Sequence, residues 1–246
     1  MKEDTMALES VHGGLLEALK HGWEFFTSPG VYFDRLALRT HWLTPVVVVA
    51  AGTILLAWLM APYSDRAMRY WLVEMAGPEA AQRPEAFQET GIWGGLAAPL
   101  PLLGISLAQA ALLMVIANVF TGRGSFRKMF SLVAHVSVFS LAASVFVYVV
   151  LFLRGLENIQ SWADFKVPIG LNMIWAELGP GMDALLNALN VFQAFTIGYL
   201  MIGVRRMCQC SRGHAALVTL TFSLLDLGCR ISMAVLFSAM RMGPKG

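Results

Sequence analysis

WGGLAAPLPLLGISLAQAALLMVIANVF at residues 93–120 and MFSLVAHVSVFSLAASVFVYVVLFL at residues 129–153 are two long apolar runs, joined by the short basic connector TGRGSFRK at 121–128. Neither run contains Asp, Glu, Lys or Arg. A helix rises 1.5 Å per residue, so about 20 apolar residues cross a bilayer core about 30 Å thick. The pattern therefore predicts two helices that cross a membrane as a hairpin.

The overall composition indicates the same class of protein. The chain has 246 residues, of which 57% are hydrophobic and only 14% are charged, whereas soluble domains carry about 25% charged residues. The deficit is expected in a bilayer, where one charge at the centre costs about 2.5–3.5 kcal/mol on insertion scales. The formal net charge of +2 is too small to indicate nucleic acid as a partner. Little length is left for a separate catalytic domain.

Three further spans are predicted, at 42–61, 184–204 and 215–238, with a short tail at 239–246. The fold class is therefore all-α: a polytopic bundle of about five transmembrane helices over 42–238. Pro99 and Pro101 predict a kinked or broken outer end of the second span. The polar region 62–92 favours a short separate helix near its start, over 67–75. The loop 154–183, rich in Trp and Pro, is either re-entrant or surface-lying.

Residues 1–41 form an N-terminal segment with an amphipathic stretch at 10–28. Leu15, Leu19, Trp23 and Phe26 recur at helical spacing, with charged residues on the other side. This pattern is typical of a helix that lies in the headgroup region of a membrane. A helix packed on the end of the bundle fits the pattern equally well.

Positive charge in the connectors predicts the orientation. Connectors 121–128 and 205–214 each carry three Lys or Arg and no acid, and short basic connectors face the cytoplasm. We therefore expect the N-terminus in the cytoplasm, the C-terminus outside, and a cytoplasmic contact surface at these cations. They are Arg123, Arg127, Lys128, Arg205, Arg206 and Arg212.

Two ionisable residues lie four apart in the fifth span, Asp226 and Arg230. This spacing places them on one helix face in the favourable order for an ion pair. Ionisable groups inside a bilayer are candidates for function. The alternative is an intrahelical pair that makes both charges tolerable, with Arg230 reaching toward the membrane boundary.

Other polar residues inside the spans are expected to join helices. His135 is predicted to be a hydrogen-bonded contact between helices, because no other metal ligand accompanies it at ligand spacing. Asn190 and Gln193 are amides of the kind that hold helices together in membranes. Small residues at Gly198 and Gly203 favour close helix packing. No catalytic set, metal site or cofactor motif is found, so the sequence favours a protein that is not an enzyme.

Cys208 and Cys210 form a C-x-C pair beside Arg205 and Arg206. Such a pair is a candidate for lipidation, or for a thiol activated by positive charge. An unmodified loop is the third interpretation, and the three cysteines do not make a disulfide framework.

Four short motifs, in order, resemble the Yip1 family of five-span membrane proteins, particularly its bacterial members. They are FFTSPGVYFDRL at 25–36 followed by WLTP at 42–45, GRGSFRKMFSLV at 122–133, LNVF leading to Gly203 at 189–203, and SRGHAAL at 211–217. The family typically has Asp-x-Phe, then Ile-Trp, in the fourth span. Phe192 and Gly203 keep the family spacing, whereas Asn190 replaces the Asp and Phe195 the Trp.

The resemblance implies five spans, a cytoplasmic N-terminus and no enzymatic activity. Eukaryotic relatives are trafficking factors that interact with Rab GTPases, a property that we do not transfer to this chain. The leading hypothesis is a protein of a bacterial inner membrane that organises partners or shapes the bilayer. Its expected partners are lipid and either another membrane protein or a second copy. The alternative is a small carrier or channel subunit that uses the polar groups inside its spans.

Overall fold

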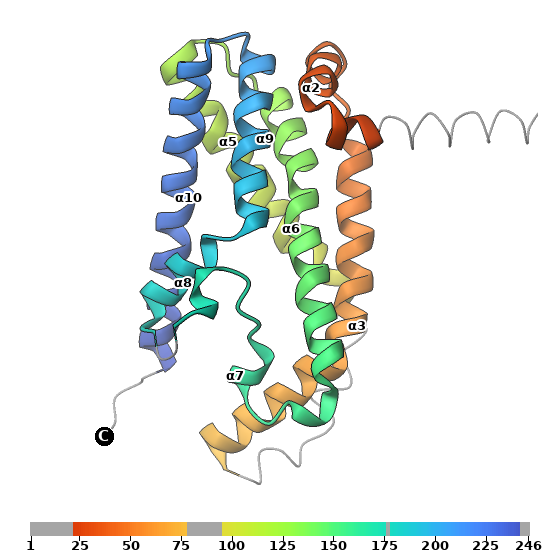
Figure 1. Ribbon diagram of the computed structural model, residues 1–246, viewed down its shortest axis with the longest axis vertical. Coiled ribbons are helices and arrows are strands. Elements are labelled where there is room, and N and C mark those ends of the chain that lie inside the picture. The colour runs from red at the N-terminus through yellow and green to blue at the C-terminus, as the bar shows by residue number, and fades with distance from the viewer. Residues whose placement is uncertain (1–21, 78–94, 176–177, 242–246) are drawn as a thin grey trace, which may run out of the picture.

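The structure, a computed structural model, describes residues 22–77, 95–175 and 178–241. Within these ranges the chain is helical and contains no strand. The long helices are α3 (Leu43–Ala76), α5 (Pro99–Thr121), α6 (Phe126–Arg154), α9 (Val191–Cys208) and α10 (Arg212–Arg241). The shorter elements are α2 (Pro29–Leu38), η2 (Leu156–Asn158), α7 (Trp162–Phe165), η3 (Leu171–Met173) and α8 (Pro180–Ala188). Figure 1 shows the long helices side by side, with α2 at one end and α7 toward the other.

Among the described residues, four helices are long and apolar enough to cross a membrane, at Leu43–Glu74, Gly95–Thr121, Phe126–Arg154 and Arg212–Leu236. A fifth crossing exists if α8 and α9, which are bent by 59° relative to each other, are counted as one broken span. The predicted class, an all-α polytopic membrane protein, is confirmed. At the outer end of the second span, where a kink or break was expected, a single turn residue, Ala98, interrupts the helix and keeps helical backbone angles, so that Gly95–Thr121 counts as one span. Pro99 begins α5, where its missing N–H needs no partner.

The main core lies at the end of the bundle that carries α2 and the two basic connectors, which we call the connector end. Buried apolar side chains from α2, α5, α6, α9 and α10 meet there. Gly203 of α9 lies directly against Leu132 of α6, so that a β-carbon at this position would overlap the leucine side chain. The predicted close approach is therefore found at Gly203, whereas a β-carbon at Gly198 would meet nothing within 4 Å.

Helix α3 continues far beyond the predicted span. It runs without interruption to Ala76, with Pro62 inside it, where a separate helix had been expected. A second, smaller core explains why the helix continues: Tyr63 and Ala67 of α3 are buried together with Leu151 and Ile159. Arg66 Nε donates a hydrogen bond of 2.8 Å to the carbonyl oxygen of Ile159. These contacts compensate for the hydrogen bond that a proline inside a helix removes.

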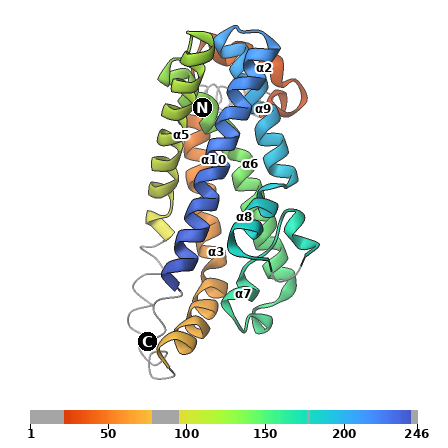
Figure 2. The ribbon, with the colours of Figure 1, turned by 90° about the vertical axis from the view of Figure 1, so that its left-hand side faces the viewer.

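The fourth span is broken rather than continuous. Asn190 is the N-cap of α9, and its Oδ1 accepts a hydrogen bond of 2.8 Å from the backbone N–H of Gln193. Backbone groups at the break find partners in the preceding loop: Leu171 N–H donates to Leu189 O at 3.3 Å, and Ile169 N–H to Asn187 Oδ1 at 3.1 Å. Figure 2 shows α8 beside the lower half of α10, which it contacts. The bend is therefore supported on both sides.

Candidate functional surface at the connector end

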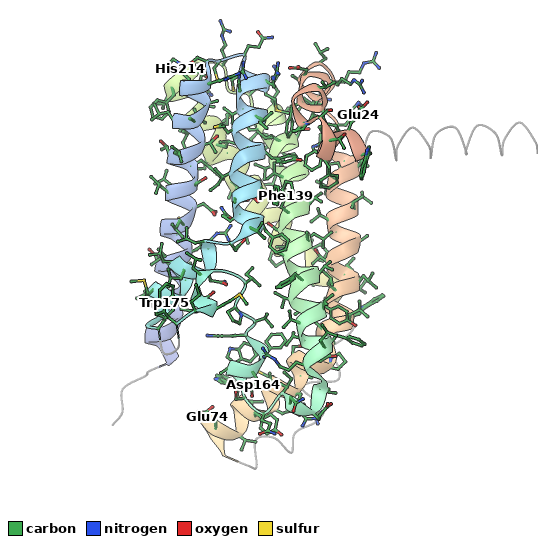
Figure 3. The ribbon with its side chains drawn as sticks, in the orientation of Figure 1. Glu24, Glu74, Phe139, Asp164, Trp175 and His214 are labelled. Carbon is green, nitrogen blue, oxygen red and sulfur yellow. The ribbon has the colours of Figure 1, made fainter. Side chains whose placement is uncertain are left out.

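The N-terminal segment is fastened to the bundle by one aromatic residue. Phe25 is 5% exposed, and its ring packs against aromatic rings that include those of Tyr32 and Phe33 of α2, Phe139 of α6 and Tyr199 of α9. The Tyr199 hydroxyl also donates a hydrogen bond of 3.3 Å to the carbonyl oxygen of Phe26. The segment therefore packs on the end of the bundle, close to Phe139, which Figure 3 labels.

Trp23 and Phe26 lie on the outside of this segment. Their side chains are 69% and 53% exposed, and the sequence pattern placed them on the apolar face of the predicted amphipathic helix. They have the exposure expected of side chains that face lipid headgroups. Residues 10–21 of the predicted amphipathic helix lie outside the described residues.

The two connectors are tight turns built by local backbone chemistry. Gly122 has a φ of +66° and ends α5, a conformation that glycine adopts without cost. Gly124 N–H donates to Asn118 Oδ1 at 2.8 Å, and a β-carbon on Gly124 would come within 2.8 Å of Met114 O. The α9–α10 turn is closed by Ser211, whose Oγ accepts a hydrogen bond of 3.3 Å from the backbone N–H of His214. Both turns hold their cations in fixed places.

The six predicted contact cations all lie at the connector end, but some of them contact neighbouring helices and others are exposed. Arg206 Nη1 pairs with Asp34 Oδ2 of α2 at 3.1 Å. Lys128 Nζ donates a hydrogen bond of 3.3 Å to Met207 O, at the C-terminal end of α9, where positive charge is favourable. These two cations hold helices together. Arg205 is partly buried, and Arg123, Arg127 and Arg212 lie exposed on the surface.

The cysteine pair does not have the properties of an activated thiol. Cys208 is 1% exposed and belongs to the main core, so its lipidation would require the side chain to leave that core. Cys210 is partly buried, and burial raises the pKa of its thiol although Arg205 and Arg123 act to lower it. The sequence could not anticipate this, because the charges are visible in the sequence and the burial is not.

The intramembrane ion pair is formed and has a third member. Arg230 Nε lies 2.7 Å from Asp226 Oδ2, and Gln109 Nε2 of α5 donates a hydrogen bond of 2.9 Å to Asp226 Oδ1. The Asp226 side chain is 15% exposed and that of Arg230 is 53% exposed. The sequence did not associate Gln109 with this pair, because the two helices are 117 residues apart.

The remaining predicted polar residues lie at other places. His135 Nδ1 is 2.6 Å from Ser131 O of its own helix, and its ring is 5.4 Å from that of Tyr32. Asn190 caps α9 through its Oδ1, and its Nδ2 donates a hydrogen bond of 2.7 Å to Asn187 O of α8, so that its side chain links the two helices at the break. Gln193 contributes its backbone N–H to this cap. The described parts of the chain contain no group of three or more His, Cys, Asp or Glu that could hold a metal ion.

A groove with a volume of about 710 Å³ opens between the N-terminal segment, α2, the start of α3 and α6. This size is within the range of about 300–1,000 Å³ that is usual for small-ligand sites. Its polar and aromatic lining residues are Phe25, Phe26, Tyr32, Arg35, Arg39, His41, Thr44 and His135. Its aliphatic lining residues include Leu36, Leu38, Pro45, Val48 and Val138. No local sequence pattern indicates this groove, since its two walls are almost 100 residues apart in the chain.

The Yip1 domain family matches residues 23–230, which is most of the chain. No curated protein gives a significant match. No solved structure does so either.

Proposed function

This chain belongs to the Yip1 domain family, and we propose that it is a non-enzymatic membrane protein that organises partner proteins through its connector end. The observation that supports this proposal is that some cations at the connector end bind other helices, whereas others are exposed. Arg206 and Lys128 fix α2, α6 and α9 to one another. Arg123, in the α5–α6 turn, and Arg127 and Arg212, at the starts of α6 and α10, are left exposed, which suits a surface that binds an acidic partner segment.

We place the connector end in the cytoplasm, of a bacterial inner membrane. Eight Lys or Arg and two acids of the described residues belong to the connectors and to residues 22–41 at this end. The bases are Arg35, Arg39, Arg123, Arg127, Lys128, Arg205, Arg206 and Arg212, and the acids are Glu24 and Asp34. Positive charge concentrated next to spans favours the cytoplasmic side. The contact surface would then be accessible to cytoplasmic proteins and to the cytoplasmic parts of membrane proteins.

The carrier or channel hypothesis has weaker support. Its polar groups would have to line one path. Asp226 binds Arg230 of its own helix and Gln109 of α5, however, whereas Asn190 caps α9 at the break in the fourth span. Neither the groove nor a smaller apolar cavity between α3, α5 and α6 is lined by these groups. His135 lines the groove, at a separate place. Scattered contacts of this kind are typical of helix packing.

The test is capture of the tagged full-length protein from its own membranes in mild detergent, with mass spectrometry of the proteins retained. We compare the wild type with Arg123→Gln/Arg127→Gln/Arg212→Gln. The matched control, Arg69→Gln/Lys166→Gln, removes exposed cations from the opposite end. We expect a near-stoichiometric partner that the triple variant loses and the control keeps.

Two results would contradict the proposal. One is a wild type that retains no protein beyond copies of itself. The other is a partner that both variants lose, or both keep, to the same extent. In either case the next measurement is solute flux in liposomes, which addresses the carrier hypothesis.

A further inference from the structure

We propose that the groove at the connector end binds one anionic phospholipid, with its phosphate at Arg39 and His41 and an acyl chain along the aliphatic wall. The site depends on neither a protein partner nor the organising function proposed above. Three features of the groove carry the inference: its charge, its depth along α3 and the fixed position of its walls.

The charge is concentrated at the mouth. Arg39 and His41 are exposed and line the groove, and they follow α2 and precede Leu43, where the first span begins. Arg35, also at the mouth, is engaged with Glu24 at 2.5 Å. Cations at the end of a span lie at the depth of the phosphate groups, and an anionic headgroup is attracted by each of them.

The aliphatic wall runs from the mouth into the membrane layer. Pro45 and Val48 of α3 line it, and from Leu43, where α3 begins, to Val48 the helix advances by about 7.5 Å at 1.5 Å per residue. Val138 of α6 contributes from the other side, and Leu38 also lines the groove. Together these residues offer a polar entrance above an apolar channel, which matches the two chemical parts of a phospholipid.

The walls are held in place by contacts with one another and with the rest of the bundle. Ser131 Oγ donates a hydrogen bond of 3.1 Å to His41 O, which ties the α2–α3 connection to α6. The Asp34–Arg206 pair fixes α2 on α9, and Phe25 is enclosed by aromatic rings. A site that is already formed loses little entropy when it is filled. The groove is therefore ready for a lipid without rearrangement.

The experiment is native mass spectrometry of the full-length protein, titrated with phosphatidylglycerol and, separately, with phosphatidylcholine of the same acyl chains. We compare the wild type with Arg39→Gln/His41→Gln, which removes the headgroup contacts. Val48→Trp keeps the charge and narrows the apolar channel. The matched control, Arg123→Gln/His214→Gln, removes the same residue types at the same end, outside the groove. Size-exclusion chromatography and thermal unfolding verify that each variant is folded.

We expect the wild type to bind a first phosphatidylglycerol in preference to phosphatidylcholine. Arg39→Gln/His41→Gln should bind it about tenfold more weakly, from about one surface cation and one further hydrogen-bonding group. Val48→Trp should also weaken it, and the control should bind as the wild type does. If Val48→Trp fails to fold, the comparison of Arg39→Gln/His41→Gln with its matched control is sufficient to test the proposal.

Three outcomes would overturn the inference. The control could weaken binding as much as Arg39→Gln/His41→Gln does, which would mean diffuse attraction to the whole basic end. The two lipids could bind equally, which would exclude recognition of charge. The wild type could bind no lipid at all, as it would if the residues before Gly22 or another protein segment filled the groove.

Discussion

Breaking the Asp226–Arg230 pair should have very different effects depending on which partner is removed. Arg212 begins α10, so Asp226 lies 14 residues along the helix, or about 21 Å, and Arg230 lies 18 residues along it, or about 27 Å. In an apolar core about 30 Å thick, Arg230 is thus close to the far boundary. Its side chain is 53% exposed, against 15% for Asp226.

Arg230→Gln leaves a carboxylate inside the membrane with only Gln109 as partner. A full charge at the bilayer centre costs about 2.5–3.5 kcal/mol, and at this depth we expect about 2 kcal/mol. Asp226→Asn leaves Arg230 able to reach the boundary. The asparagine oxygen also still accepts from Gln109, so the loss should be about 0.5–1 kcal/mol, the usual worth of one such contact in a membrane.

The double variant Asp226→Asn/Arg230→Gln should cost about 1 kcal/mol, less than Arg230→Gln alone, because no unpaired charge is left. The assay is the free energy of unfolding in bicelles by steric trapping, arranged as a double-mutant cycle. Cys229→Ala, an exposed change on the same turn, is the control and should be close to neutral. The reasoning is refuted if Asp226→Asn lowers the free energy of unfolding as much as Arg230→Gln does. It is also refuted if the loss in the double variant equals the sum of the two single losses.

Asn190→Ala should destabilise the protein by about 1 kcal/mol through loss of the α9 cap, and Asn190→Asp should restore most of it, both read by the same unfolding assay. Gly203→Ala should cost about 1–3 kcal/mol by forcing the buried leucine opposite it out of place; a near-neutral result would mean that α6 and α9 separate easily. Gly170→Ala should be at least as harmful, because its β-carbon would meet backbone atoms of α8, one of them at 2.6 Å. Maleimide should label Cys210 faster than the buried Cys208, and, since burial raises the pKa of the Cys210 thiol, the rate should still be rising above pH 9; a plateau near neutral pH would contradict this.

The long apolar runs made the membrane class predictable, because about 20 residues without charge have few other uses. The break in the fourth span was also visible in the sequence, although it was not recognised. Asn190 stands three residues before Gln193, the spacing of an N-cap and the N–H that it accepts. The sequence analysis assigned both residues to helix contacts, since amides in a membrane commonly have that role.

The N-cap role of Asn190 also explains why Asn can stand in place of the Asp of the family motif. Asp and Asn are nearly equal as N-caps, so Asn190 keeps the physical role that the family's Asp suits. Phe195, in place of the Trp, stacks on Phe139 with ring centroids 5.7 Å apart. Both replacements therefore make a defined contact in this chain.

Other features could not be predicted from local patterns. The continuation of α3 depends on Ile159, which lies 93 residues from its partner Arg66. The groove needs α6 to come against the start of α3, and Gln109 reaches Asp226 across the whole chain between α5 and α10. In each case the deciding contact is long-range, and residues near in sequence contain no trace of it.

The second core, around Tyr63, has a practical consequence for anyone who wishes to modify this protein. It shares no residue with the main core, and α3 ends beside it at Gly77, which has a φ of +83° and no atom within 4 Å of a β-carbon. A reporter domain inserted directly after Gly77 would thus be attached to a helix end anchored locally, remote from the connector end. Such a fusion would act as an inert marker of which side of the membrane that end occupies, while the connector end stays untouched for binding studies.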